Sequence, residues 1–384
     1  MGNQRPKLNE NIYFYLTLSL GFLAALIIGE FGLRLFLKDK NPRVEFIYQD
    51  KIIHCYPDDP FQSFSLDLRR AKDYDFFSNI LPTIQLSDPL LKDHPSLGRF
   101  AHPASTTEPE NRQYLEENNP FCLIYETDKN SSRRQVLIEN AQNSIALIGD
   151  SFAFGQGVQA DQTFAAQLAP VLKSNIYNFA SLGADNVEIF EQYNQMIPLL
   201  TEKKVKTVIY LFVLNDPFVT PELRERQNFV FDFMNRRDYK MQTHFSFAWS
   251  RLISFTSQVI KMRQVNSETI RWYHDVFNPQ KNPQIHMTFD AISKLEQSAK
   301  QLGGNFILAI YPLMDDFRSY RFEKVHRSIQ YLTQHYKITT IDLLPAFQAE
   351  KLQLPIVHPS DYHPNATAHK LAALYFAERY AALR

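Results

Sequence analysis

From residue 144 to the end of the chain, short apolar segments alternate with longer segments of helical periodicity. This alternation is typical of a parallel sheet that is covered by helices on both faces. The sequence therefore predicts a three-layer α/β/α domain. The expected strands are 145–149, 175–180, 206–214, 305–313 and 338–343, and the expected helices are 163–172, 186–200, 288–301, 320–336 and 366–383.

One connection in this alternation is unusually long. Residues 217–285 separate the third expected strand from the fourth, and an ordinary crossover is far shorter. The segment is rich in aromatic residues and holds both tryptophans of the chain. Two interpretations remain open: a lid or substrate wall beside the strand ends, or a helical subdomain that packs on the core or on a membrane.

The N-terminal segment, residues 1–40, contains a candidate membrane helix. Residues 12–29 form a run of 18 residues without a charge, and a helix of that length is just able to cross a bilayer core of about 30 Å. Apolar residues continue to position 37, and Glu30 and Arg34, spaced i,i+4, are expected to pair at the interface. We expect an uncleaved single-pass anchor over about 12–37, with a cleaved signal peptide and a buried core helix as the alternatives. Basic residues flank both ends of the helix, so charge alone does not orient it.

Residues 41–143 are predicted to form an irregular membrane-proximal segment. They are rich in Pro, Asp and Ser, and their apolar runs are short. Only 121–128 is expected to add a strand. The role of this segment stays open.

Composition excludes several classes of function. The 384 residues include 41 basic and 41 acidic ones, so there is no electrostatic case for a nucleic-acid partner. Two cysteines, Cys55 and Cys122, are too few for a disulfide framework or a thiolate zinc site, and whether they pair stays open. No His/Asp/Glu spacing indicates a metal, and no cofactor is expected.

The segment 145–158, IALIGDSFAFGQGV, is the first that indicates chemistry. The expected strand ends at Gly149, and Ser151 follows in a loop at its carboxyl end, where catalytic groups collect in open α/β sheets. Ser151 is a candidate nucleophile, although a serine here could also simply cap the next helix. The segment is not a G-x-S-x-G elbow, because position 153 is Ala153, and it lacks the G-K-[ST] of a phosphate-binding loop.

The segment 358–373, HPSDYHPNATAHKLAA, is the second segment that indicates chemistry. A serine nucleophile needs a base, and the base needs an acid that orients it. Asp361 and His363 supply these groups, in the chain order Ser, Asp, His. His358 and His369 are expected to be structural.

Together these segments resemble the SGNH (GDSL-type) hydrolase superfamily, which carries four short blocks on a flavodoxin-like α/β/α domain. The resemblance covers about residues 144–384 and implies Ser151 as the nucleophile, with Asp361 and His363 completing a triad. The matching blocks are GDS at 149–151, NFASLGADN at 178–186, FVLND at 212–216 and DYHPNATAH at 361–369.

The same resemblance implies an oxyanion hole. Its expected donors are the backbone amides of Ser151 and Gly183 and the side-chain amide of Asn215. The chain differs from the common pattern at Val213, where many members have Gly, and in placing Asp361 two residues before the histidine instead of three.

The resemblance implies a serine esterase or O-acyltransferase that forms an acyl-serine intermediate. The expected substrate is an acyl ester, with an acetyl group, on a glycan or cell-envelope component. Members of the superfamily that carry an N-terminal membrane anchor suggest that the catalytic domain lies outside the cytoplasm, in the periplasm or outside the cell. Alternatives are a hydrolase of lipid or other carboxyl esters, a catalytically silent binding module for glycans or proteins, and a soluble α/β protein whose first helix belongs to its core.

Overall fold

The computed structural model describes residues 8–36, 44–48, 51–56, 121–126, 133, 136–184, 186–202, 205–228, 250–358 and 361–383. The chain divides into two compact units. The smaller unit consists of Met1–Asn41 and Phe229–Thr269, and the larger unit consists of Pro42–Asn228 and Ile270–Arg384.

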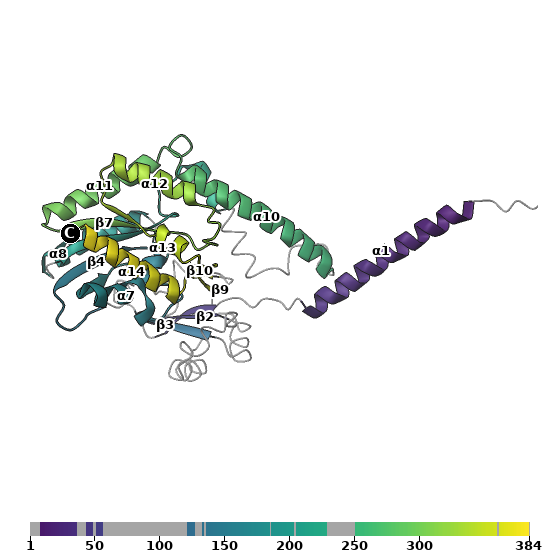
Figure 1. The fold of residues 1–384 in the computed structure, drawn as a ribbon, viewed down its shortest axis with the longest axis horizontal. Coiled ribbons are helices and arrows are strands. Elements are labelled where there is room, and N and C mark those ends of the chain that lie inside the picture. The colour runs from purple at the N-terminus through teal and green to yellow at the C-terminus, as the bar shows by residue number, and fades with distance from the viewer. Residues whose placement is uncertain are drawn as a thin grey trace, which may run out of the picture. The chain divides into compact units, whose positions relative to one another are not determined.

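The larger unit is built on a five-stranded parallel sheet with the strand order β5-β4-β6-β7-β8. In this order the second strand of the domain lies at one edge, which is the flavodoxin-like arrangement. Helices α7 and α14 pack together on one face, and α8, α11 and α12 cover the other (Figure 1). The prediction of a three-layer α/β/α domain is therefore confirmed. The strands are β4 Asn143–Gly149, β5 Ser174–Asn178, β6 Val205–Val213, β7 Asn305–Tyr311 and β8 Thr340–Asp342, and the helices are α6 Ser151–Phe154, α7 Phe164–Leu172, α8 Asn186–Glu202, α11 Ile285–Gln301, α12 Glu323–His335, α13 Leu344–Ala349 and α14 Ala366–Ala382, with a short 3-10 turn, η1, at Ala160–Gln162.

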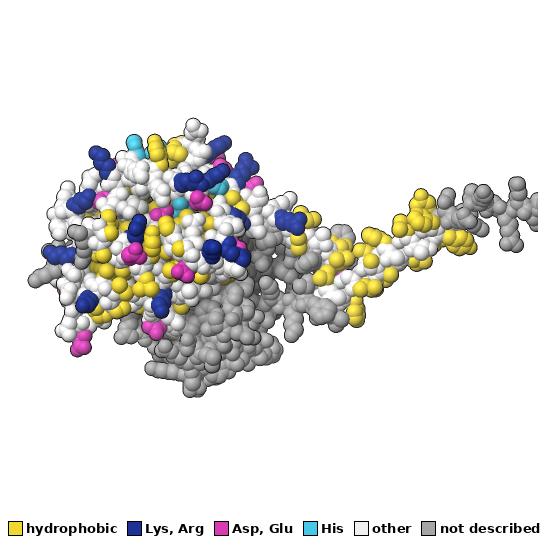
Figure 2. Space-filling model, in the orientation of Figure 1, with side chains coloured by type: hydrophobic (Ala, Val, Ile, Leu, Met, Phe, Trp, Pro, Cys, Tyr) yellow, Lys and Arg dark blue, Asp and Glu magenta, His cyan; other side chains and the backbone are white. Residues whose placement is uncertain are grey.

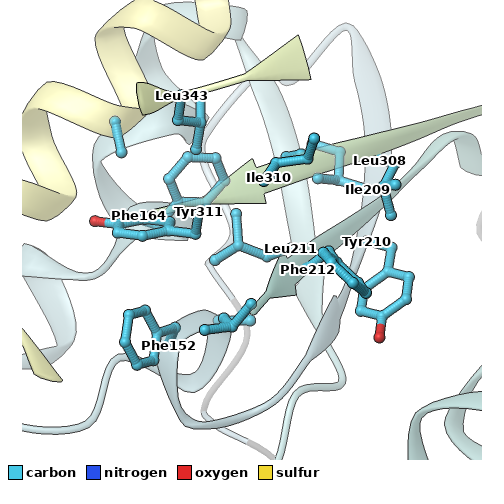
Figure 3. Packing of buried hydrophobic residues seen from close by; sticks show 14 of the residues in the cluster. Phe152, Phe164, Ile209, Tyr210, Leu211, Phe212, Leu308, Ile310, Tyr311 and Leu343 are labelled. Carbon is cyan, nitrogen blue, oxygen red and sulfur yellow. The ribbon is translucent and has the colours of Figure 1, made fainter. Parts of the chain in front are cut away.

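The core lies on both sides of the central strands. The last seven residues of β6 are all buried, as expected of a strand that is covered on both faces. Aromatic rings fill the space between the sheet and its helices (Figure 3). The rings of Phe152 and Tyr311 pack edge to face with centroids 5.5 Å apart, and Phe164 contacts Phe376 of α14 at 5.8 Å.

A second, three-stranded antiparallel sheet replaces the irregular structure that we predicted for part of 41–143. Strand β3 (Phe121–Glu126) coincides with the expected strand, whereas β1 (Val44–Tyr48) and β2 (Lys51–Tyr56) were not predicted. Their β-branched and aromatic residues suit a strand, but β2 pairs with a segment 65 residues away, and local periodicity does not reveal such a pairing. The register places Cys55 opposite Cys122.

The smaller unit contains helix α1 (Leu8–Phe36). Its window Ile12–Leu33 is long and apolar enough to cross a membrane, and none of that window is buried. Figure 2 shows hydrophobic side chains along the described length of the helix, on the face in view. A helix of a soluble core would be mostly buried, so the alternative of a core helix does not fit α1. Helix α10 (Arg251–Val276), a long helix of the insertion, begins in the smaller unit and ends in the larger one.

Candidate active site

The candidate nucleophile lies directly after the central strand β4. Gly149 ends the strand with φ 149°, and a β-carbon there would lie 2.8 Å from the Leu211 carbonyl oxygen of the neighbouring strand, so only glycine fits. Asp150 caps helix α6 by accepting a hydrogen bond from the Phe152 backbone N–H at 2.9 Å. Ser151 begins the helix and is 8% exposed. The turn therefore holds Ser151 at the carboxyl edge of the sheet.

The structure brings Ser151, His363 and Asp361 together. Ser151 Oγ lies 2.7 Å from His363 Nε2. His363 Nδ1 is in short hydrogen-bond contact with Asp361 Oδ1, and the His363 backbone N–H donates to the same oxygen at 3.1 Å. Asp361 is 2% exposed. With Nδ1 protonated towards Asp361, Nε2 is left free to accept the Ser151 proton.

A β-hairpin supplies the acid and the base. Strand β9 (Ile356–His358) pairs antiparallel with β10 (Asp361–Pro364), and Asp361 lies opposite His358. Asp361 precedes His363 by two residues. In strand β10 this spacing lets the Asp361 carboxylate reach both the backbone and the ring of His363. Phe152, next to the serine, packs its ring 5.3 Å from the His363 ring.

Asn215 lies beside the serine loop through a contact with Asp150. It follows β6 by two residues, and its side chain is close enough to the Asp150 carboxyl group to lower the pKa of that group. Burial raises the pKa of Asp150 to about 6, against the opposing influence of the Phe152 N–H, the nearby His363 and Asn215. Asp150 thus faces both the candidate base and the candidate oxyanion donor.

A second buried carboxyl group, Asp216, supports the Asn215 turn. It accepts hydrogen bonds from the Val213 backbone N–H and the Tyr210 hydroxyl, both at 3.0 Å. Burial, together with the nearby Asp150 charge, raises the pKa of Asp216 well above its usual range. Asp150 and Asp216 each accept a hydrogen bond from backbone, from Phe152 in α6 and from Val213 at the end of β6 respectively.

Gly183 is placed by the topology of the sheet. It lies in a turn after β5 and has φ 64°, a left-handed conformation that suits glycine. Strands β5, β4 and β6 are adjacent and parallel, so the loops that carry Gly183, Ser151 and Asn215 lie along one edge of the sheet.

Two residues far from the serine in sequence hold its loop, and sequence reasoning missed both. The Tyr125 hydroxyl accepts a hydrogen bond from the Gly157 backbone N–H at 2.6 Å. The buried Arg133 guanidinium stacks 4.5 Å from the centroid of the Tyr125 ring and donates to the Gly155 and Val158 carbonyls at 3.2 and 3.0 Å. A tyrosine in a strand and an arginine in a polar stretch carry no motif, so no local signal was available.

Asn178, in the second block of the resemblance, has a related role. Its side chain donates to the Ala153 carbonyl and accepts from the Ala180 backbone N–H, both at 3.0 Å. It therefore joins the end of β5 to helix α6.

The histidines expected to be structural lie outside the triad as far as the structure describes them. His369 is fully buried in α14, and burial lowers its pKa to about 3, so the ring is neutral. The side chain of His358 is outside the described residues.

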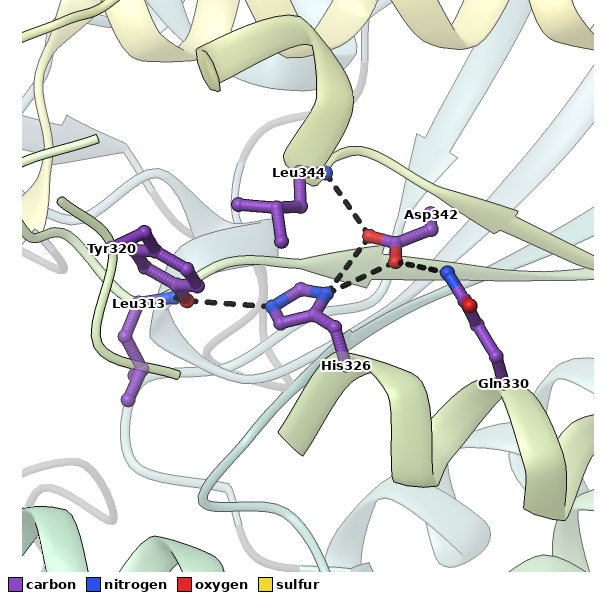
Figure 4. A network of polar contacts seen from close by, with 6 residues as sticks. All are labelled: Leu313, Tyr320, His326, Gln330, Asp342 and Leu344. Carbon is purple, nitrogen blue, oxygen red and sulfur yellow. Dashed lines mark hydrogen bonds and ion pairs between the residues drawn. The ribbon is translucent and has the colours of Figure 1, made fainter. Parts of the chain in front are cut away.

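A second histidine also lies between an aspartate and a hydroxyl group, as in the triad, but here the hydroxyl belongs to a buried tyrosine (Figure 4). His326 Nδ1 contacts Asp342 at 2.9 Å, and His326 Nε2 lies 3.3 Å from the Tyr320 hydroxyl. That hydroxyl accepts a hydrogen bond from the Leu313 backbone N–H, and burial raises the pKa of Tyr320 well above its usual range. These residues therefore hold the loop after β7 and offer no nucleophile.

Tyr362 is the chain neighbour of the base, and an arginine–aspartate pair interacts with this tyrosine. Tyr362, between Asp361 and His363, is 44% exposed. Arg321 forms an ion pair with Asp315 through two hydrogen bonds of 2.8 Å. Asp315 raises the pKa of Arg321, and Tyr362 makes a smaller contribution in the same direction. Among the described residues, no group of His, Cys, Asp and Glu could hold a metal ion.

Comparisons with known proteins find similarity only among solved structures. No family model matches the chain, and no curated protein does. An acetylxylan esterase from Geobacillus stearothermophilus, Axe2, is 12% identical, with 62% of this chain and 94% of that chain covered and a TM-score of 0.37. A member of the lipolytic G-D-S-L family from Veillonella parvula is 11% identical, with 62% and 98% covered and a TM-score of 0.36. LAE5, an α/β hydrolase from the Lake Arreo metagenome in Spain, is 12% identical, with 64% and 98% covered and a TM-score of 0.39. At these values the chemistry of the site has to be argued from its own residues.

Proposed function

We propose that this protein is a serine hydrolase of the SGNH type that acts on ester bonds through an acyl-Ser151 intermediate. The observation that carries the proposal is the contact of 2.7 Å between Ser151 Oγ and His363 Nε2, with Asp361 on the other ring nitrogen. This is the geometry that lets a base take a serine proton.

The first half of the reaction acylates the serine. Ser151 Oγ attacks the carbonyl carbon of the ester while its proton passes to His363 Nε2. The bond between the carbonyl carbon and the alcohol oxygen then breaks, and the proton moves from His363 to the departing alcohol. Asp361 orients the ring and stabilises the imidazolium that forms between these steps.

The second half frees the serine. Water, or the hydroxyl of an acceptor sugar, attacks the acyl carbon and gives its proton to His363. The Ser151–acyl bond breaks, and the proton returns to Oγ. Hydrolysis and acyl transfer share these residues and differ only in the acceptor.

The negative charge on the carbonyl oxygen is stabilised by amide donors. The Ser151 and Gly183 backbone N–H groups and the Asn215 side chain are the proposed donors, at the edge where the loops of three neighbouring strands meet.

A silent binding module is the less suitable interpretation. Such a module has no need of a serine hydroxyl aligned on a histidine that is itself aligned on a buried carboxylate. The hydrogen-bond distance at Ser151 lies within the range expected for a working nucleophile and base, about 2.6–3.2 Å, so we favour the enzyme.

For the substrate we propose a small acyl group, acetyl in the first place, on a glycan or another cell-envelope component. Ser151 is only 8% exposed, which favours a short acyl chain over a long one. Tyr362, the chain neighbour of the base, offers an exposed aromatic surface of the kind that a hydroxyl-rich alcohol can pack against.

The first experiment measures release of p-nitrophenol from p-nitrophenyl acetate by the full chain and by Ser151→Ala, His363→Ala and Asp361→Asn. We expect each variant to lose activity, by about 10⁴-fold for the serine and the histidine. The matched controls are Ser328→Ala and His335→Ala on α12, which leads back to the opposite edge of the sheet. Folded variants with undiminished activity would refute the proposal.

A chain-length series then tests the acyl group. Acetate esters should be cleaved faster than octanoate esters, and O-acetylated glycan should release acetate. A preference for octanoate or for phospholipid would support the alternative, a hydrolase of lipid esters.

We further propose that α1 anchors the chain in a membrane and that the larger unit lies outside the cytoplasm. The length and apolarity of the window Ile12–Leu33, none of which is buried, support the anchor. A mature chain that retains residues 1–36 by mass spectrometry, resists carbonate extraction and is degraded by external protease is the expected result. A chain cleaved after the apolar run would instead reveal a signal peptide.

A further inference from the structure

The start of helix α10 is hydrogen-bonded to the candidate membrane helix. Glu30 of α1 accepts a hydrogen bond from the Ser250 hydroxyl and another from the Leu252 backbone N–H, both at 2.9 Å. The Ser250 hydroxyl in turn accepts from the Ile253 backbone N–H at 3.2 Å. The first N–H groups of a helix lack partners inside the helix, and a carboxylate is the most favourable acceptor for them. Glu30 therefore caps α10 from another helix.

This contact places the start of α10 at a definite level along α1. Glu30 lies three residues before Leu33, the last residue of the apolar window, which is about 4.5 Å of helix. A carboxylate so close to the hydrocarbon needs polar partners, and Ser250 and Leu252 provide them. Gly29 faces the same turn, since a β-carbon added there would lie 3.9 Å from the Leu252 side chain. The first turn of α10 thus lies at the carboxyl-terminal boundary of the apolar window.

The first half of α10 has the composition of a helix at a membrane surface. By sequence, residues 251–265 include three basic residues and no acidic one. Ile253 and Ile260, seven residues apart and so on one face, are 42% and 54% exposed. Arg263 is exposed as well. Exposed apolar side chains beside basic ones suit the boundary between acyl chains and anionic headgroups.

We propose that the first half of α10, residues 250–265, lies in the headgroup region of the bilayer that α1 crosses, with Ile253 and Ile260 against lipid. The partner is a lipid surface with anionic headgroups. Two observations favour a lipid surface as the partner. One is the pair of hydrogen bonds to Glu30 at the end of the apolar window, and the other is that all charged residues of 250–265 are basic. The inference rests on the proposed anchor and is independent of the ester chemistry.

The test measures depth in the bilayer for the full chain in nanodiscs. A fluorescent amino acid is introduced through an amber codon at one position at a time, which leaves the native cysteines untouched, and lipids that carry a nitroxide near the headgroup or deep in the acyl chain quench it. The positions are Ile253 and Ile260 for the proposal, Phe22 in α1 for the anchor, and Met287 of α11, 61% exposed, as the control.

We expect the shallow nitroxide to quench positions 253 and 260 about twofold or more above Met287, and more strongly when phosphatidylglycerol is added to phosphatidylcholine. The deep nitroxide should quench Phe22. Quenching at 253 and 260 that is no greater than at Met287 would overturn the proposal. If Phe22 is unquenched too, the anchor is wrong; if Phe22 alone is quenched, the anchor stands and the α10 contact is wrong. Ester hydrolysis is assayed separately and decides neither outcome.

A matched pair of variants tests the link to α1. Glu30→Ala removes the oxygen that binds Ser250 and Leu252, whereas Glu30→Gln keeps one acceptor of the same reach. Shallow quenching at position 253 should fall towards the Met287 value in Glu30→Ala and be largely retained in Glu30→Gln. Equal quenching in both variants and the native chain would overturn the role of Glu30 in placing α10.

Discussion

A β-carbon at Gly157 would lie 2.3 Å from Cγ2 of Val357, so the loop after Ser151 and strand β9 approach each other as closely as a glycine allows. Val357 belongs to the hairpin whose second strand carries Asp361 and His363. The fit between Gly157 and Val357 therefore bears on the position of the base relative to the serine.

Gly157→Ala should lower both stability and activity. The φ of 87° already disfavours alanine, and the methyl group must in addition push Val357 and its hairpin away. The matched control is Gly303→Ala, which has a similar φ of 75° but nothing within 4 Å of the new methyl group. We expect both variants to lose about 1 kcal/mol of unfolding free energy from backbone strain, and Gly157→Ala to lose a further 1–3 kcal/mol or so from overpacking. Denaturant unfolding and kcat measure the two effects, and equal losses in the two variants would contradict the explanation.

Tyr125→Phe tests whether the residues before the α/β/α domain support the serine loop. The substitution keeps the ring and removes the acceptor of the Gly157 N–H, which should reduce the unfolding free energy by about 1–3 kcal/mol and lower kcat. Tyr331→Phe, at a position 68% exposed, is the control and should change neither quantity. A kcat equal to that of the native chain would show that the loop keeps its place without this hydrogen bond.

The fold and the central residues of the site could be predicted because their signals are local. A buried parallel strand is a continuous apolar run, and a catalytic loop follows it directly, so Ser151, Asp361 and His363 could each be recognised within a short segment. The strand ends were placed to within two residues, because apolar periodicity fixes the middle of a strand better than its ends.

The remaining features depend on contacts between distant segments. The pairing of β2 with β3, the support of the serine loop by Tyr125 and Arg133, and the Glu30 contact with Ser250 all join residues that no local pattern relates. The expected Glu30–Arg34 pair is a local pattern, but the side chain of Arg34 is outside the described residues. The long insertion shows the same limit, since its helical character was predictable and its hydrogen bonds to α1 were not.

Asn215→Ala should lower kcat far more than it raises KM. If the side-chain amide meets the carbonyl oxygen as negative charge develops, its removal costs about 10²- to 10³-fold in kcat. Asn305→Ala, at the exposed start of β7 and thus at the other edge of the sheet, is the matched control. Loss through KM alone would assign Asn215 to substrate binding rather than to the oxyanion.

Asp150→Asn should stabilise the protein at neutral pH while slowing the reaction. Burial raises the pKa of Asp150 from 3.8 to about 6, so the folded chain holds this proton more tightly than the unfolded chain. The stability that the protonated group contributes is complete below pH 3.8 and is lost as the pH rises through 6, a change of about 3 kcal/mol at most. Asp150→Asn has no carboxyl group to deprotonate at this position, so it does not lose this stability as the pH rises.

The free energy of unfolding is therefore compared at pH 4 and pH 8 for the native chain, Asp150→Asn and the surface control Asp161→Asn. From pH 4 to pH 8, the stability of Asp150→Asn relative to the native chain should rise by up to about 3 kcal/mol, and by more than that of Asp161→Asn. The kcat of Asp150→Asn should fall about tenfold, because a neutral amide does not attract the imidazolium of His363 as a carboxylate does. A difference in stability that is independent of pH would mean that Asp150 does not titrate in this range. An undiminished kcat would mean that its charge, which costs stability, has no catalytic use.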